Sequence, residues 1–153
     1  DDTEQHSKPS LVWTNTKKNL NEREKEYFLK ICDLCAEKGI PLLVVAYPNP
    51  DYANDRMYYN ALWALADERG VPHLNLNDPE GHYRFRYSTE FADWQHVNNL
   101  GSLKLSKILG TYLSGHYDLP DHRGDSAYAG WDACLEEWVS AYPQYADSLG
   151  TEE

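Results

Sequence analysis

The chain has 153 residues, of which 41% are hydrophobic and 13% aromatic, and its formal net charge is −11. This length and composition predict one folded globular domain with a sizeable core rather than a disordered chain. The negative charge argues against partners such as nucleic acid or anionic membrane surfaces, because their phosphates would be repelled. No apolar run approaches the ~20 residues that a membrane span needs.

The first predicted helix follows a polar segment. Residues 1–20 are expected to be loose, with a short strand or extended entry at Ser10–Thr14. Asn21 is the predicted N-cap, and Glu24 follows three residues later as in a capping box. Gly39 ends the helix. Apolar residues recur at i, i+3, i+4 and i+7, which predicts an inward face made of Phe28, Ile31, Cys32 and Cys35.

The sequence pattern at the end of this helix is repeated once later in the chain. Residues 36–43 and 66–74 both run from a helix end through a glycine, a β-branched residue and a proline into a strand. Leu42–Tyr47 is continuously apolar, the pattern of a parallel strand covered on both faces, whereas His73–Asn77 alternates as expected nearer an edge. Residues 51–69 form the helix between them, with an inward face of Tyr58, Leu62, Leu65 and Ala66. This order predicts an α/β fold with a layered parallel sheet.

The rest of the chain reads as a long loop followed by two helices. Residues 78–91 are rich in Asp, Pro, Gly and Tyr and are expected to be irregular. Asn99 is expected to cap the next helix, whose buried stripe would be Leu105, Ile108, Leu109 and Tyr112, with Gly115 as the stop. The last helix ends near Pro143 and has a stripe of Trp131, Leu135, Trp138 and Tyr142. We expect a single α/β domain over 21–146 and a tail over 147–153.

The segment most suited to chemistry is Asp93-Trp94-Gln95-His96, just before an amphipathic helix. A carboxylate three residues before an imidazole can accept the Nδ1 proton, fix the tautomer and leave Nε2 facing a nucleophile. The alternative is a hydrogen bond that only orders the loop before the helix, since Asp-x-x-His by itself is common.

An α/β chain whose last core helix is preceded by Asp-x-x-His, with Asn and Gly just after, resembles the C-terminal half of an SGNH (GDSL-type) hydrolase. The resemblance covers roughly Tyr27 to Tyr128. This part of the chain is similar to bacterial members of the family that are linked to cell-surface acyl transfer. It implies a three-layer parallel-sheet sandwich of the SGNH or flavodoxin-like kind, without its N-terminal strand or strands. It also implies Asp93 and His96 as the carboxylate and base of a Ser-His-Asp triad.

The nucleophile is not identified by the sequence. A literal Gly124-Asp125-Ser126 occurs, but it follows a loop sequence downstream of the histidine, whereas the family's serine follows a buried strand. We therefore do not assign Ser126, and neither Ser88 nor Ser102 has a strand-to-helix elbow. The serine-bearing block is expected to lie outside this chain, which leaves little or no esterase activity in isolation.

Three further residues are candidates for substrate binding. Tyr47 and Asn49 follow the first strand at its C-terminal end, where α/β sheets bind ligands. Asn98 lies two residues after the histidine. No metal or cofactor is expected, because the histidines lack ligand spacing and Cys32 and Cys35 lie inside a helix; these are expected to be buried structural cysteines, with a zinc site as the less favoured reading.

Two functions stay open. The first is an SGNH-like esterase or O-acyltransferase module acting on an acyl ester, with a carbohydrate or cell-envelope polymer as the expected substrate. The second is a non-catalytic α/β domain that binds a ligand or partner. The partner would be a second copy of the chain or a missing N-terminal segment that pairs with an exposed sheet edge. Relatives of this kind are often extracytoplasmic, but no residue of the chain reports a compartment.

Overall fold

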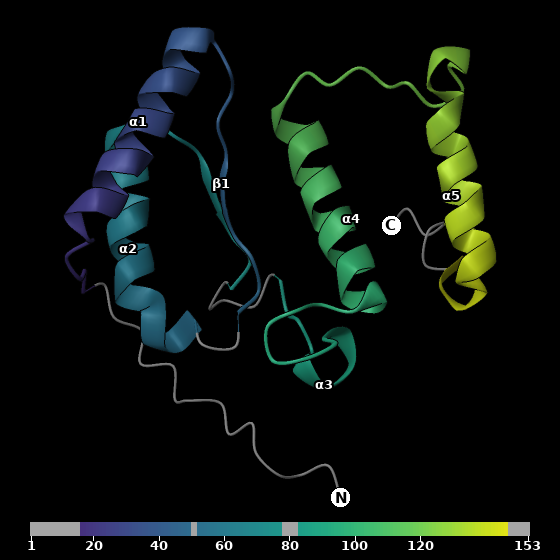
Figure 1. Cartoon of the computed structure of the whole chain (residues 1–153), viewed down its shortest axis with the longest axis horizontal. Helices are drawn as coiled ribbons and strands as arrows, with labels where there is room; N and C mark the ends of the chain where they lie inside the picture. The colour runs from purple at the N-terminus through teal and green to yellow at the C-terminus, as the bar shows by residue number, and fades with distance from the viewer. Residues whose placement is uncertain (1–15, 50–51, 78–82, 147–153) are drawn as a thin grey trace, which may run out of the picture. The chain divides into compact units, whose positions relative to one another are not determined.

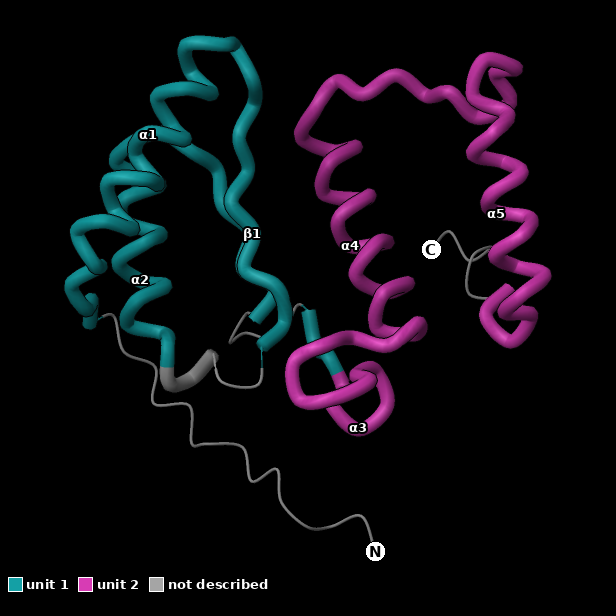
Figure 2. Tube along the Cα trace, in the orientation of Figure 1, with its two compact units in different colours: residues 1–85 teal, residues 86–153 magenta. Residues whose placement is uncertain are grey.

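A computed structural model describes residues 16–49, 52–77 and 83–146. The chain is a mostly helical α/β protein with a small two-stranded parallel sheet (Figure 1). It separates into two compact units, Asp1–Phe85 and Arg86–Glu153 (Figure 2). A single domain over 21–146 stays a prediction, because compact units of one chain can still unfold together. The strand expected at Ser10–Thr14 and the tail at 147–153 lie outside the described residues.

The first unit contains two helix–strand pairs, namely α1 (Glu22–Lys38), β1 (Val44–Ala46), α2 (Tyr52–Glu68) and β2 (His73–Asn75). Asn21 caps α1 as predicted, since its side chain accepts a hydrogen bond from the backbone N–H of Arg23 at 2.9 Å. Just before the helix, the backbone N–H of Lys18 donates to the carbonyl of Met57 at 3.0 Å. The looseness expected for residues 1–20 as a whole stays a prediction.

The repeated helix ends adopt the same geometry. Gly39 and Gly70 have φ of 66° and 64°, a left-handed conformation that glycine adopts without a Cβ penalty. After each glycine, the next backbone N–H reaches back five residues, from Ile40 to Cys35 at 2.8 Å and from Val71 to Ala66 at 2.9 Å. The repeated sequence pattern is therefore a repeated helix C-cap, after which the chain enters each strand.

The two strands pair in parallel, with Val44 opposite His73 and Ala46 opposite Asn75. The core of this unit is formed by residues from all four elements and from the segment just after β2: Cys32, Ala46, Leu65, Ala66, Leu74 and Leu76. Both strands are shorter than the segments 42–47 and 73–77 that the pattern predicted. The segment 42–45 is half-buried and Tyr47 is exposed, so the prediction of a strand covered on both faces is wrong within the described residues.

The inward face of α1 is also narrower than predicted. Cys32 is buried and Cys35 half-buried, whereas Ile31 is 50% exposed. Periodicity placed Ile31 with the buried residues because it lies next to them in the helical repeat. On α2, Leu65 and Ala66 are buried as predicted, but Tyr58 is exposed.

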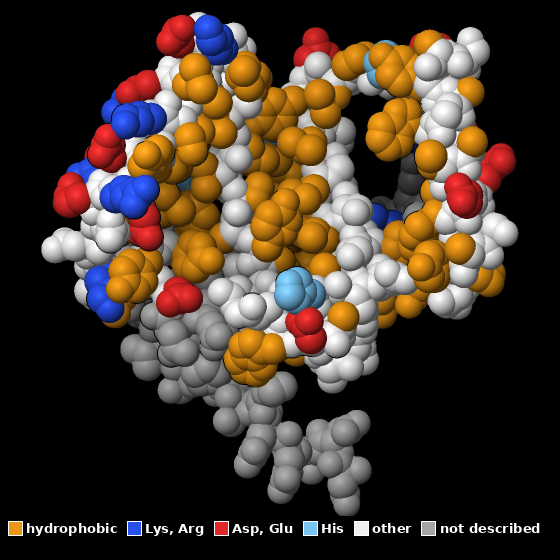
Figure 3. Space-filling view, in the orientation of Figure 1, with side chains coloured by type: hydrophobic (Ala, Val, Ile, Leu, Met, Phe, Trp, Pro, Cys, Tyr) orange, Lys and Arg blue, Asp and Glu red, His pale blue; other side chains and the backbone are white. Residues whose placement is uncertain are grey.

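The second unit contains α3 (Tyr87–Glu90), α4 (Asn99–His116), α5 (Ala129–Ala141) and the short 3₁₀ turns η1 (Ser126–Tyr128) and η2 (Pro143–Tyr145). The helix α3 falls inside the segment that was predicted to be irregular. The predicted stripe of α5 is not buried: Trp131 is 75% exposed and Leu135 51%. Figure 3 shows apolar side chains exposed on both units.

The cap of α4 is Asn98, one residue before the predicted Asn99. Oδ1 of Asn98 accepts hydrogen bonds from the backbone N–H groups of Leu100 and Gly101 at 3.0 and 3.1 Å. Asn99 is the first helical residue. Either asparagine suits a cap by chemistry, and the turn that enters the helix decides between them.

Candidate functional site

The segment between α3 and α4 is a closed turn. Phe91 and Val97 form an antiparallel bridge, and the backbone N–H of Ala92 donates to the carbonyl of His96 at 2.8 Å. The four residues of the Asp-x-x-His motif therefore lie at the tip of a small loop whose two ends are joined. A loop held at both ends by helices keeps its tip in a defined place.

Asp93 organises the tip. Its Oδ1 accepts the backbone N–H of Gln95 at 2.8 Å and that of His96 at 2.9 Å, which is an Asx-type turn. These backbone hydrogen bonds, with the hydrogen bond to the ring of His96, lower the pKa of Asp93 to about 2. The carboxylate is therefore ionised throughout the neutral range.

The imidazole of His96 lies against this carboxylate. Its Nδ1 is 2.9 Å from both Oδ1 and Oδ2 of Asp93. An ionised carboxylate can only accept, so Nδ1 must carry the hydrogen, and the lone pair of the neutral ring is then on Nε2. Within the described residues no hydrogen bond occupies Nε2, and the His96 side chain is 76% exposed. The ring presents a basic nitrogen to solvent with a fixed tautomer.

This arrangement is a carboxylate–imidazole dyad with an open face. It can remove a proton from a hydroxyl group that approaches Nε2, and Asp93 can stabilise the imidazolium that forms. In the described part of the chain, no serine is hydrogen-bonded to His96. Ser126 instead begins η1, whose cap is Asp125, as expected for a loop residue.

The side-chain amide of Asn98 is hydrogen-bonded through both its oxygen and its nitrogen. Besides capping α4, it donates from Nδ2 to the carbonyls of Thr89 at 2.8 Å and Phe91 at 3.3 Å. The amide oxygen thus bonds the first turn of α4, and the amide nitrogen bonds carbonyls at the end of α3 and the start of the loop. Asn98 follows His96 by two residues, and its hydrogen bonds hold the loop against α4. A role of Asn98 in substrate binding stays a prediction.

Tyr47 and Asn49 belong to the first unit, whereas Asp93 and His96 belong to the second. A shared site for these residues stays a prediction. They lie just after β1, at the C-terminal end of the parallel pair. The side chain of Asn77 joins them: its Nδ2 donates to the carbonyl of Tyr47 at 2.7 Å, and its Oδ1 accepts the N–H of Asn49 at 2.6 Å. Sequence reasoning missed Asn77, although an asparagine directly after the second strand is a signal for such a bridge.

The other histidines that the structure describes, and the cysteines, have local explanations. His73 stacks on Trp63 with 4.6 Å between ring centroids, and His116 and His122 stack on Tyr112 and Tyr128. Among residues 16–49, 52–77 and 83–146, no three His, Cys, Asp or Glu side chains are grouped to hold a metal ion. Cys32 is buried, Cys35 is half-buried and Cys134 is exposed.

Comparison with known proteins finds no family model that matches the chain, and no curated protein or solved structure that is significantly similar to it. In the ranges that the structure describes, no helix has the length and apolar character needed to cross a membrane. The assignment of function therefore depends on the geometry of the site.

Proposed function

We propose that Asp93 and His96 form the general-base dyad of an acyl-ester hydrolase or O-acyltransferase. One observation carries the proposal: Nδ1 of His96 is held at 2.9 Å from both oxygens of Asp93, and Nε2 faces solvent. The same contact without catalysis would be a turn-stabilising hydrogen bond, which does not require an open Nε2. The substrate class, a carbohydrate or cell-envelope ester, comes from the resemblance to SGNH hydrolases.

In the proposed reaction, Nε2 of His96 takes the proton of an attacking hydroxyl as its oxygen bonds to the ester carbonyl carbon. The tetrahedral intermediate then collapses, and the imidazolium returns the proton to the leaving alcohol. Asp93 stays ionised and stabilises the transient positive charge. The serine that would form the acyl intermediate is not assigned, and a water or an alcohol would accept the acyl group.

The finer fold proposal is the C-terminal half of an SGNH-like three-layer sandwich. Two features support it. The parallel strands β1 and β2 are joined through a helix, as in a βαβ unit, and the dyad lies directly before a long helix. Both strands have an outer edge with no ladder partner among the described residues, so the sheet can accept further strands.

Hydrolysis of p-nitrophenyl acetate by the intact chain tests the proposed base directly. This activated ester reacts with a neutral imidazole without a serine. We expect His96→Ala to remove most of the histidine-dependent rate and Asp93→Asn to reduce it, since the ring loses its tautomer control. The matched control is His116→Ala, because His116 Nδ1 lies 2.8 Å from the carbonyl of Tyr112. Equal rates of ester hydrolysis for the wild type and His96→Ala would contradict the proposal.

A fluorophosphonate probe addresses the nucleophile separately. We expect no serine of the chain to be labelled, because none is held against His96 in the described residues. A label lost on His96→Ala would locate the nucleophile within this chain. That result would support the dyad and contradict the expectation that the serine comes from elsewhere.

Partner binding is the second candidate function, and one surface favours it. The α1 stripe (Tyr27, Ile31 and Leu34) repeats at i, i+4 and i+7, and each of its residues is at least half exposed. Glu24 and Lys38 lie on the same side of the helix, seven residues before and after Ile31. An antiparallel pairing of two α1 helices would place each Glu24 beside Lys38 of the second copy, so the stripe is self-complementary.

Light scattering coupled to size exclusion tests this pairing. We expect a dimer that Ile31→Asp converts to the 17.7 kDa monomer. Lys38→Glu should weaken the dimer, and the charge swap of Lys38→Glu with Glu24→Lys should restore it. A wild-type monomer at all accessible concentrations would exclude the second copy as the occupant of the stripe.

A further inference from the structure

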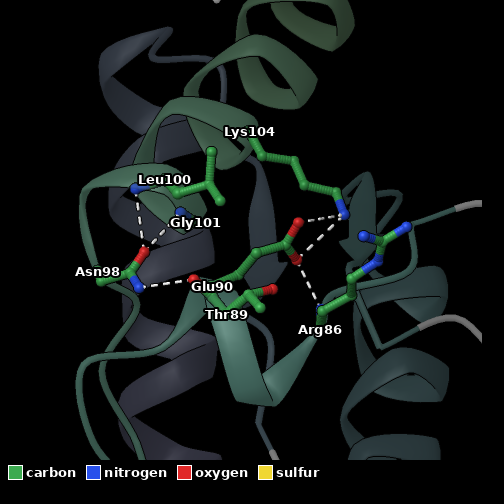
Figure 4. A network of polar contacts seen from close by, with 7 residues as sticks. All are labelled: Arg86, Thr89, Glu90, Asn98, Leu100, Gly101 and Lys104. Atoms are coloured by element: carbon green, nitrogen blue, oxygen red, sulfur yellow. Dashed lines mark hydrogen bonds and ion pairs between the residues drawn. The ribbon is translucent and has the colours of Figure 1, made fainter. Parts of the chain in front are cut away.

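A buried carboxylate lies at the end of the helix that enters the dyad's loop. Glu90 is the last residue of α3, and only 8% of it is exposed. Nζ of Lys104 on α4 lies 3.1 and 3.2 Å from its two oxygens, and Oε2 also accepts the backbone N–H of Arg86 at 2.6 Å (Figure 4). A buried charge persists only when it is paired and hydrogen-bonded, so this pair joins α3 to α4.

The two helices approach so closely that one position must be glycine. A Cβ built on Gly101 would overlap the backbone oxygen of Glu90 and lie 2.9 Å from Cβ of Val97. Gly101 is in the first turn of α4 and is itself buried. Backbone atoms cannot move aside as a flexible side chain can, so any larger residue must push α4 away from α3.

The contact surface continues directly into the loop. The backbone N–H of Asn98 donates to the carbonyl of Glu90 at 3.0 Å, and Nδ2 of Asn98 donates to Thr89 and Phe91. Figure 4 shows the ion pair and the cap of α4 on adjoining parts of this interface. The residues on both sides of the Asp-x-x-His tip are therefore anchored to the same helix–helix contact.

We propose that Gly101, Glu90 and Lys104 are positioning residues for the dyad: they lock α3 against α4 and thereby fix His96 relative to Asp93. The inference rests on the proposed function for its catalytic consequence, but its geometric part does not. Asp93 and His96 are both exposed, at 58% and 76% of their side chains, so neighbouring side chains do not confine them. The fixed orientation of the two side chains must therefore come from the backbone of the loop, which the contact between α3 and α4 holds closed.

Nitrogen NMR of the His96 ring in the full chain tests the lock without any substrate. In the wild type we expect the Nδ1–H tautomer, because the ring faces an ionised carboxylate. Gly101→Ala should shift the population toward Nε2–H and raise the pKa of Asp93 from about 2 toward 3.8. The matched control is Gly110→Ala in the same helix, where a Cβ meets open space and nothing should change.

Lys104 provides a second variant in case Gly101→Ala fails to fold. Lys104→Met should loosen the dyad in the same way, and Lys104→Arg, which keeps the charge, should restore the tautomer. Ester hydrolysis should fall about tenfold to a hundredfold in Lys104→Met, the loss expected when a catalytic group is misplaced. Folded Gly101→Ala and Lys104→Met proteins with an unchanged His96 tautomer would overturn the inference. A shifted tautomer together with hydrolysis that does not depend on His96 would uphold the lock and overturn only the proposed function.

Discussion

Oδ1 of Asp93 accepts the backbone N–H of His96 at 2.9 Å and lies at the same distance from Nδ1 of its ring. One carboxylate oxygen thus shapes the turn and orients the imidazole. The local fold and the proposed chemistry depend on the same atom, so a change at Asp93 should affect both. This coupling gives the first prediction a readout in stability as well as in activity.

Asp93→Asn should reduce stability in a defined pH window. The folded pKa of Asp93 is about 2, below the ordinary 3.8, so the ionised carboxylate favours the folded state. This contribution is fully present above the unfolded pKa and is lost as the pH falls through the folded pKa. The difference in unfolding free energy between wild type and variant should therefore be constant above about pH 5 and shrink steadily as the pH falls toward 2.

Urea titrations between pH 2 and pH 7 measure this difference. Asp121→Asn is the comparison, because Arg123 also lowers the pKa of Asp121 to about 2. It should show the same pH window while leaving the His96 tautomer unchanged. A pH-independent difference for Asp93→Asn would contradict the role of its ionised carboxylate.

Asn98→Ala and Asn99→Ala should differ sharply although the two residues are neighbours. Asn98 caps α4 and also bonds the carbonyls of Thr89 and Phe91, so its loss should cost more than the ~1 kcal/mol typical of an N-cap. Asn99 is the first helical residue, and its replacement should change stability by less than about 0.5 kcal/mol. Chemical denaturation of both variants identifies the capping residue. Equal losses of stability in the two variants would show that Asn98 is not the only cap of α4.

Leu76→Ala should be the most damaging apolar truncation in the first unit. Leu76 follows β2 and is 1% exposed, so removing its side chain leaves a cavity that costs about 2–5 kcal/mol. Ile40→Ala is the control, since Ile40 is 56% exposed and lies in the same unit. Thermal unfolding followed by circular dichroism should show a clear loss for Leu76→Ala and a small change for Ile40→Ala.

The three cysteines should react with iodoacetamide in a fixed order. Cys134 is exposed and should react first, the half-buried Cys35 second and Cys32 last. Burial raises the pKa of Cys32, which lowers its thiolate fraction as well as its access. Peptide mass spectrometry over time measures the order, and all three rates should converge in urea. Rapid modification of Cys32 in the native protein would show that α1 detaches from the core.

Local sequence signals predicted the elements of the first unit well. The cap at Asn21, the glycine stops at Gly39 and Gly70 and the helix–strand order depend on neighbouring residues only, so they can be read along the chain. The Asp93–His96 contact is equally local, because its partners lie three residues apart. Burial was harder to predict: Ile31 and Trp131 lie on apolar stripes that the sequence placed in a core and the structure exposes.

By itself, therefore, the sequence determined an α/β chain with a carboxylate–imidazole dyad ahead of a long helix. Only the tertiary structure showed what supports that dyad. Glu90 and Lys104 are 14 residues apart and follow no motif. Nothing in the amino-acid sequence requires a glycine at position 101. The requirement arises because α3 and α4 meet backbone to backbone at Gly101. Contacts of this kind depend on how two helices approach each other in space, which periodicity and spacing do not encode.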